Sequence, residues 1–518
     1  MKNPYLEHIR HTLPRLLALM DGDRTSASFG MADRYRWAWG LIDFGNGTFQ
    51  GAAHGLARLW QAGLWPYNTG RDQFLRRIDA LFLGAGRLAR ADGSMEEAFP
   101  NEGSFCVTAL VAFDLLCAID LLRDDASEEM RQRWQAIVRP LIGYLNTADE
   151  SHALISNHLA TAVAALARWS ELTGEVAAEL RARELLVRIL HHQSGEGWFL
   201  EYEGADPGYQ SLCTYYLADV HRLRPEWGLA EPLERSLRFL WHFAHPDGSF
   251  GGLYGSRCTR FYYPAGSEAL ASELPEAAAL ASYMSESIAS GRVVTLSAMD
   301  EPNLVPMFNS YCWAAVLWSL GEQTKAVPKL PAQSGEVFRR TFVQTGLFID
   351  SGPEHYTIIN THKGGVVAHF QRGKVAIINA GVVVSNKKNQ LGSSQAFSVN
   401  NDVKLVGDLL HVESIISPMP KQLPTPIQFI LLRILCLTFF RFGHFREWGK
   451  QLLVRLLITR RSQWPVRNIR HIQLGPLLSV SDRLITAKGY SAVSDPGPFV
   501  AIHMASQGYW QFQDELTK

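Results

Sequence analysis

The chain has 518 residues, of which 47% are hydrophobic and 19% charged, with 50 basic and 50 acidic side chains. The balanced charge indicates no particular partner, and nucleic acid is not expected because no basic face interleaved with aromatic residues appears outside residues 425–463. The length exceeds what one hydrophobic core usually serves, so two or more domains are expected. Six scattered cysteines without a close pair argue against a disulfide framework and suit a reducing compartment. The first residues, MKNPYLEHIRHTLPRLLALMDGD, lack the apolar core and cleavage site of a secretory signal, so we expect cytoplasmic residence, with peripheral contact at the inner membrane as a further option.

Residues 50–320 have the pattern of a long series of helices. Apolar side chains recur every three or four positions in at least eight stretches, and short turns rich in Gly, Pro, Asp and Ser separate them. Helices in sequential pairs predict an α/α toroid or an α-solenoid, and the lack of a fixed-period repeat favours the closed toroid. We therefore place an α/α toroid domain at residues 1–335.

The sequence pattern changes in residues 336–518, where short β-branched runs bounded by Gly, Asn and Asp replace the helical pattern. They predict an antiparallel β-sandwich domain. The expected fold class is therefore α+β and multidomain, with an N-terminal α/α toroid followed by a β-sandwich that carries a helical insert.

The insert is residues 425–463, which are apolar and strongly basic. Its apolar run, 427–440, is only fourteen residues long and contains Arg433, so it is too short to span a bilayer. Three interpretations remain open. The segment forms a helical hairpin that packs on the sandwich, or an amphipathic element that docks on anionic lipid or a partner, or a site for an acidic glycan.

Two polar side chains open the stretch ISNHLATAVAALARW at 155–169, which is otherwise an Ala/Leu helix. If Ser156 or Asn157 caps this helix, Asn157 and His158 lie in its first turn, where the helix macrodipole favours anions. An amide and an imidazole at that point could bind a carboxylate. The alternative is a capping Asn beside a core His.

Three further stretches carry candidate site residues. In EGADPGYQSLCTYYLADV, at 203–220, Tyr209 follows a Pro-Gly turn and begins another apolar helix, although it could equally be a packing residue. The loop GGLYGSRCTRFYYPAGSEAL, at 251–270, crowds Arg257 among tyrosines that include Tyr254 and Tyr263; Arg suits carboxylate recognition, and a domain interface is the alternative. In INTHKGGVV, at 359–367, His362 lies at a hairpin tip that could reach a neighbouring domain.

Weaker signals come from Trp39, in the aromatic-rich stretch 33–55, and from Glu102, which precedes a helix in FPNEGSF. Aromatic residues line sugar-binding clefts but also fill cores, and capping explains Glu102 equally well. Phosphate-binding and dinucleotide-binding glycine loops are absent, as are HExxH, CxxC and GxSxG.

A helical toroid followed by a β-sandwich, with SNH on one helix and PGYQ about fifty residues later, resembles the heparinase II/III-like group, which includes alginate lyases. The resemblance implies a polysaccharide lyase acting on a uronic-acid glycan by β-elimination. It implies that Asn157 and His158 neutralise the uronate carboxylate, that Tyr209 transfers the proton and that His362 completes the site. Arg257 would be a further carboxylate or sulfate contact. It implies no cofactor, and no zinc-ligand set is evident in the second domain.

Other functions remain open at this point. A uronate C5 epimerase shares the first step, because it also removes the proton α to the carboxylate. A glycan-binding or assembly protein at the membrane surface would keep the fold without turnover. A glycoside hydrolase would need two opposed carboxylates, for which the candidates are Glu102, Asp206 and Glu268.

Overall fold

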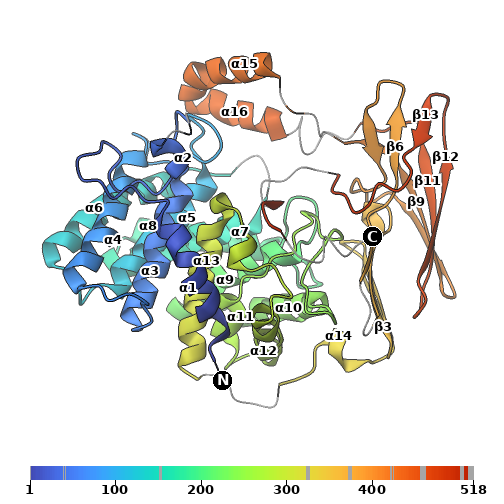
Figure 1. Ribbon diagram of the computed structural model, residues 1–518, viewed down its shortest axis with the longest axis horizontal. Helices are drawn as coiled ribbons and strands as arrows, with labels where there is room; N and C mark the ends of the chain where they lie inside the picture. Colours follow the sequence, from blue (N-terminus) through green and yellow to red (C-terminus); the bar gives the residue numbers. More distant parts are fainter. Residues whose placement is uncertain are drawn as a thin grey trace.

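The computed structural model describes residues 2–38, 40, 42–150, 154–321, 327–371, 376–419, 423, 425–454, 462–501 and 507–510. Helices occupy the chain up to residue 334 and strands follow from residue 338, with two more helices inserted late (Figure 1). The α+β class predicted from the sequence is thereby confirmed, since every strand pairing in the three sheets is antiparallel.

The helical part begins with α1 (Pro4–Leu17) and ends with the short α14 (Pro331–Ser334). Between them lie α2 (Arg34–Trp37), α3 (Ala52–Gln61), α4 (Arg71–Leu88), α5 (Phe105–Leu121), α6 (Glu128–Thr147), α7 (Ser156–Thr173), α8 (Val176–His191), α9 (Pro207–Leu223), α10 (Ala230–Leu240), α11 (Ala265–Leu270), α12 (Pro275–Ala289) and α13 (Glu301–Ser319).

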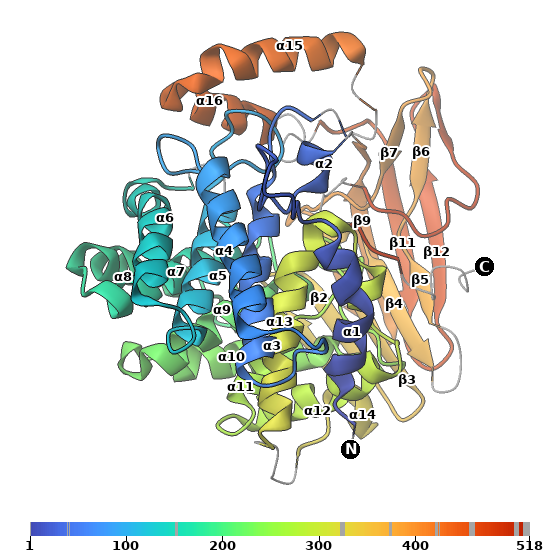
Figure 2. The ribbon, with the colours of Figure 1, turned by 60° about the vertical axis from the view of Figure 1, so that its left-hand side comes forward.

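Contacts among these helices run in a closed circuit (Figure 2). Helix α3 packs on α5, α5 on α7, α7 on α9, α9 on α11 and α11 on α13, and α13 returns to α3. Helix α5 is buried on almost every side, as an inner helix must be, and its apolar residues accordingly surround the whole helix. Helix α6 buries only one face and turns charged side chains to solvent. The mouths of α7 and α9 therefore lie on adjacent inner helices.

Three sheets follow the helices. The first has the order β1-β2-β3-β4-β5, the second β10-β7-β6-β13 and the third β12-β11-β9-β8. Their strands are β1 (Phe338–Phe342), β2 (Leu347–Ser351), β3 (His355–Asn360), β4 (Val366–Gln371), β5 (Ile377–Asn379), β6 (Val383–Asn386), β7 (Leu391–Ser393), β8 (Asp402–Val406), β9 (Leu409–Ile415), β10 (Ser417–Pro418), β11 (Arg467–Gln473), β12 (Ser479–Ile485) and β13 (Tyr490–Ala492).

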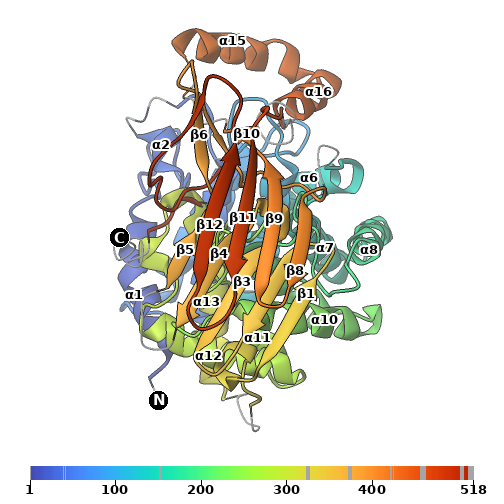
Figure 3. The same ribbon diagram turned by 90° about the vertical axis from the view of Figure 1, so that its right-hand side faces the viewer.

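The first sheet is a middle layer. Ile359 is paired with Phe348 and Val367, so their side chains share one face, and this face packs on Val412 and Ile472 of the third sheet (Figure 3). The opposite face carries residues such as Ile349 and Ile358, which pack against the helical part through Trp198, Phe239 and Phe243. This contact holds the sheets against the end of the helical circuit.

The late insert forms a helical hairpin of α15 (Pro426–Leu437), the 3-10 turn η6 (Phe439–Arg441) and α16 (Gly443–Val454). Its described contacts do not match the expectation that it packs on the sandwich. Arg446 pairs with Asp92 at 3.3 Å, and the side-chain amide of Asn101 donates to the carbonyl of Cys436. The hairpin thus rests on loops of the helical part, at the top of Figure 1. Among the described helices, none is long and apolar enough to cross a membrane.

Candidate active site

The mouth of helix α7 is closed by a carboxylate from another segment. The prediction that Ser156 or Asn157 caps the helix is wrong, because the capping position belongs to Ile155, which has no side-chain oxygen. Glu201 instead accepts a bond from the backbone N–H of Asn157 at 3.0 Å and one from its side-chain amide at 2.8 Å. The helix N-terminus therefore already holds an anion, and Asn157 is fixed in orientation by it.

His158, the next residue, is held by a second buried carboxylate. Its Nδ1 lies 2.9 Å and 3.0 Å from the two oxygens of Glu150. Burial opposes a charge on the ring, but the sulfur of Cys106 and the Glu150 carboxylate outweigh it and raise the pKa of His158 well above its ordinary value. The Glu150 carboxylate therefore favours the protonated form of the imidazole.

In the stretch DPGYQ, residues 206–210, each of the first three residues has its own structural role at the start of α9. Asp206 caps helix α9 by accepting from the backbone N–H of Tyr209 at 3.2 Å, and Pro207 occupies the first turn, where no N–H is needed. Asp206 also accepts from the backbone N–H of Arg257 at 2.9 Å and from the Thr259 hydroxyl. Any side chain at Gly208 would overlap Thr259. This one buried aspartate fixes the start of α9 against the loop that carries Arg257.

Arg257 lies over the ring of Tyr209. Its guanidinium carbon is 3.6 Å from the Tyr209 ring centroid and 5.1 Å from that of Tyr202, so the cation contacts two phenols. One of its nitrogens, Nη1, is 3.6 Å from Glu201. Nε and Nη1 have no hydrogen-bond partner in the described part of the chain, although the side chain is only 10% exposed. Buried donors left in this state are suited to a ligand.

A continuous set of contacts therefore joins residues from three segments: Asn157 to Glu201, Glu201 to Arg257, and Arg257 to Tyr209. Two residues that directly follow charged members of this set have backbones in the left-handed region: Tyr202 (φ 62°), after Glu201, and Cys258 (φ 58°), after Arg257. A non-glycine residue costs about 1–3 kcal/mol in such a conformation, and such strain is concentrated at functional sites. The side chains of His158, Tyr202 and Tyr209 are partly exposed, so the cluster opens to solvent there.

His362 is not joined to this cluster by any contact that the structure describes. It lies on the 3-10 turn η5 (Thr361–Lys363) after β3, where its ring packs edge-on against Phe397 with centroids 5.4 Å apart. Burial lowers its pKa, and Nδ1 is buried with no hydrogen-bond partner among the described residues. The neighbouring Lys363 does reach the helical part, donating to the carbonyls of Leu253 and Gly255.

Of the remaining predicted residues, Tyr263 lies beside the cluster and the others that the structure describes lie away from it. Tyr263 is buried beside the cluster, where burial and the fields of Tyr209 and Cys106 raise its pKa. Tyr254 lies deeper, with its hydroxyl 2.7 Å from Nε2 of His245. Glu102 accepts the backbone N–H groups of residues 97 and 98, which organises its own loop. Trp39 lies outside the described residues.

The carboxylates considered for a hydrolase do not face one another across an open site in any described contact. Asp206 is buried as the cap of α9, and Glu268 accepts a bond from the hydroxyl of Tyr5 at 2.5 Å in the core. The carboxylates that do border the cluster are Glu150 and Glu201, which the sequence did not single out. Each is separated in sequence from the side chain it holds, so no local spacing marks it.

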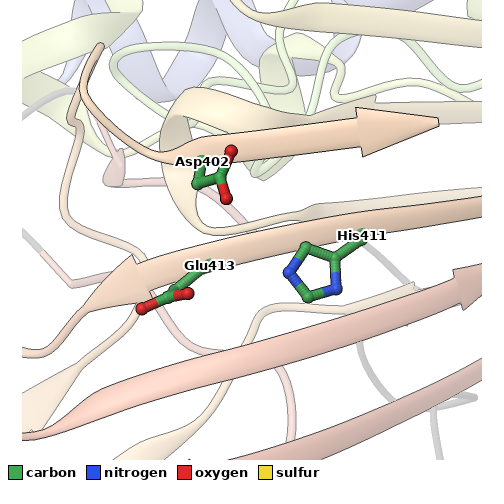
Figure 4. A group of neighbouring side chains, drawn as sticks. All are labelled: Asp402, His411 and Glu413. Atoms are coloured by element: carbon green, nitrogen blue, oxygen red, sulfur yellow. The ribbon is translucent and has the colours of Figure 1, made fainter.

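A second group of titratable side chains lies on the outer sheet. Asp402, His411 and Glu413, on β8 and β9, bring one ligand atom each within 4.8 Å of one another (Figure 4). Asp402 is 2.8 Å from Lys404, and Glu413 is 3.0 Å from Arg467. Because both carboxylates are already neutralised by cations, we assign no metal site here.

Comparison with known proteins gives a similarity of fold. No family model matches the chain, and no curated protein matches its sequence. A xanthan lyase from Paenibacillus aligns with a TM-score of 0.51 at 11% identity, over 80% of this chain and 43% of the lyase. The chondroitin AC lyase of Streptomyces coelicolor A3 aligns with a TM-score of 0.50 at 13% identity, over 81% of this chain and 65% of the lyase. This chain spans less than two thirds of either protein.

Proposed function

We propose that the protein is a polysaccharide lyase that cleaves a uronic-acid-containing glycan by β-elimination. The observation that carries the proposal is the stacking of the Arg257 guanidinium on Tyr209, with Glu201 linking Arg257 to the side-chain amide of Asn157 and His158 following Asn157 on α7. A phenol beside a cation, with an amide and an imidazole on the adjacent helix α7, supplies the kinds of group that removal of a proton α to a carboxylate requires. The similarity of fold to two lyases supports the same reaction class, and we interpret the helical circuit and facing sheets as an α/α toroid and a β-sandwich.

In this mechanism the ionised phenol oxygen of Tyr209 takes the proton from C5 of the uronate. The electrons of the C–H bond pass into the carboxylate, which becomes an aci-carboxylate stabilised by Asn157 and His158. One preorganised donor of this kind contributes about 3–4 kcal/mol. The C4–O4 bond then breaks as the C4=C5 double bond forms, and the proton on Tyr209 passes to O4 of the departing sugar.

Arg257 and Glu201 have distinct roles in this proposal. The charge of Arg257 beside the phenol favours loss of the Tyr209 proton, and the same guanidinium would bind a substrate anion that enters the cluster. Glu201 takes one of the two amide hydrogens of Asn157 and so orients that amide. Asp206 acts as a positioning residue, because it touches the backbone on both sides of the cluster.

The first experiment is a substrate panel. Purified protein is incubated with alginate, heparosan, chondroitin and xanthan, and the ultraviolet absorbance of an unsaturated uronate is followed together with new reducing ends. Unsaturated product supports the proposal. Reducing ends without unsaturation indicate a hydrolase, and exchange of C5–H with solvent deuterium without cleavage indicates an epimerase. If no uronate polymer is cleaved and none exchanges its C5–H, the reaction proposed here is wrong.

The second experiment uses the two tyrosines that contact Arg257. Tyr209→Phe keeps the ring on the guanidinium and removes only the hydroxyl, so kcat is expected to fall by about 10²–10⁴. Tyr202→Phe is the matched control and is expected to change kcat by less than about tenfold. Equal losses in both variants would remove the proton-transfer role from Tyr209.

A further inference from the structure

The hairpin of α15 and α16 exposes large apolar side chains to solvent. On α15 these are Ile427, Phe429, Ile430, Leu431, Ile434 and Leu437, each between 49% and 70% exposed. These six side chains point in directions that span roughly 200° around the axis of α15. Soluble proteins rarely leave apolar patches of this kind uncovered, and those that exist mark interaction sites.

The second arm continues the same surface. Phe442, Phe445 and Trp448 are each more than half exposed, and an apolar groove of about 320 Å³ lies between Phe445 and Trp448 on one side and Leu432 and Leu435 of α15 on the other. The side facing the body is different, because Cys436 and Arg446 are buried there. The hairpin therefore has an anchored side, where Cys436, Phe440 and Arg446 are buried, and an apolar, outward side at one end of the molecule (Figure 1).

The segment also carries a large excess of basic over acidic residues. Residues 425–461 contain seven Arg or Lys and a single Glu, in a chain whose formal net charge is zero. Two of these cations, Arg433 and Arg446, pair with Asp43 and Asp92 of the helical part and belong to the anchored side. The exposed turn between the two helices carries Arg441, which follows the buried Phe440 and precedes the exposed Phe442. A surface that combines apolar side chains with positive charge complements a bilayer that contains acidic headgroups.

We infer that this hairpin docks the protein on the surface of an anionic lipid bilayer. At twelve residues, α15 is about 18 Å long, short of the roughly 30 Å hydrocarbon core, so it lies in the interface and does not cross it. A flat protein partner covers one face of a helix, whereas fluid lipid solvates apolar side chains over more than half of its circumference. This geometry favours lipid over a second copy of the chain.

Sedimentation of the full chain with vesicles tests the inference. One set contains phosphatidylcholine with about a third phosphatidylglycerol, and the other contains phosphatidylcholine alone. We expect binding to the anionic vesicles that weakens in high salt. Arg441→Gln is expected to weaken binding about fivefold, the effect of one charge near the membrane surface.

The decisive variant carries Ile430→Ser, Phe442→Ser and Trp448→Ser, three positions that are 60–66% exposed. It is expected to bind anionic vesicles at least about a hundredfold more weakly. The matched control carries Val176→Ser, Leu180→Ser and Val187→Ser on α8, which are 63–66% exposed, and should bind like the unmodified chain.

Three outcomes would overturn the inference. The first is absence of binding to both vesicle types, and the second is equal binding by the hairpin variant and the α8 control. In the third, the hairpin variant abolishes self-association in analytical ultracentrifugation, or retention by an acidic polysaccharide, while lipid binding is absent. That result would assign the surface to a second copy or to a glycan. Product formation on a soluble oligosaccharide is independent of this result, so the docking site and the proposed reaction fail separately.

Discussion

Replacement of Gly208 by alanine tests how closely the start of α9 approaches the loop that carries Arg257. A Cβ on residue 208 would overlap the hydroxyl of Thr259 and lie 3.1 Å from Cδ2 of Phe261. Thr259 cannot move freely, because its hydroxyl donates to the buried carboxylate of Asp206. The substitution must therefore overpack the contact with the loop and also break that hydrogen bond.

The expected cost follows from these contacts. Overpacking a well-filled site costs about 1–3 kcal/mol, and loss of a hydrogen bond to a buried charged group costs about 1.5–3 kcal/mol. Alanine in place of glycine in a helix stabilises the folded state by roughly 0.5–1 kcal/mol, which offsets part of this cost. The net destabilisation is therefore about 2–5 kcal/mol. A shift of Tyr209 by about 1 Å would also reduce catalysis by about 10²-fold.

Urea unfolding followed by circular dichroism measures the first effect, and kcat on the substrate found in the panel measures the second. Gly143→Ala is the matched control, because Gly143 lies inside α6 with nothing within 4 Å of an added Cβ. It is expected to stabilise the protein by about 0.5–1 kcal/mol. If Gly208→Ala unfolds at the same urea concentration as Gly143→Ala, the close approach described here is wrong.

Three further substitutions test other contacts. Glu150→Gln removes the carboxylate beside His158, whose pKa is raised in the folded protein. A raised pKa stabilises the folded state most below the unfolded value of about 6.5, and this stabilisation is lost as pH rises through the folded value. The melting temperature of the variant should therefore fall less above neutral pH than that of the unmodified protein. An unchanged pH profile would contradict this. Glu201→Gln leaves a buried guanidinium without its counter-charge and should lower the free energy of unfolding by about 1–3 kcal/mol in urea titrations, whereas no loss would show that the ion pair is not stabilising. Arg446→Ala should release the hairpin and increase protease cleavage within 425–454 without changing the main melting transition, while Arg441→Ala, at the exposed turn, should leave cleavage unchanged. Equal cleavage in both variants would remove the anchoring role from Arg446.

The candidate site shows where local patterns stop being informative. Asp206, Pro207 and Tyr209 are adjacent in sequence, and helix capping places them together without reference to the rest of the chain. Glu201 is 44 residues from Asn157, and no local pattern links the two. The carboxylate takes the place of the cap that Ser156 or Asn157 was expected to provide, because a buried N–H must find an acceptor and chain packing brings this one nearest.

His362 marks a similar limit. Its position in a hairpin turn follows from the pattern of INTHKGGVV, and the structure does place it in the turn between β3 and β4. Which surface such a turn faces depends on how the sheet packs on the helices. In the described structure Lys363 and Asn360, its neighbours, reach the loop near Arg257, while the His362 ring contacts Phe397. The role of His362 therefore stays a prediction.

The sequence by itself determined the order of helices before strands, a helical insert late in the chain and a helix that begins close to Tyr209, since each depends on periodicity or turn chemistry within about twenty residues. The helix in fact begins two residues earlier, at Pro207. Only the tertiary structure decided that Arg257 stacks on Tyr209, that Glu150 and Glu201 hold His158 and Asn157, and that the hairpin rests on the helical part. The physical reason is that buried charges and apolar faces are satisfied by whichever segments the packing brings together, and that choice is made by the whole chain.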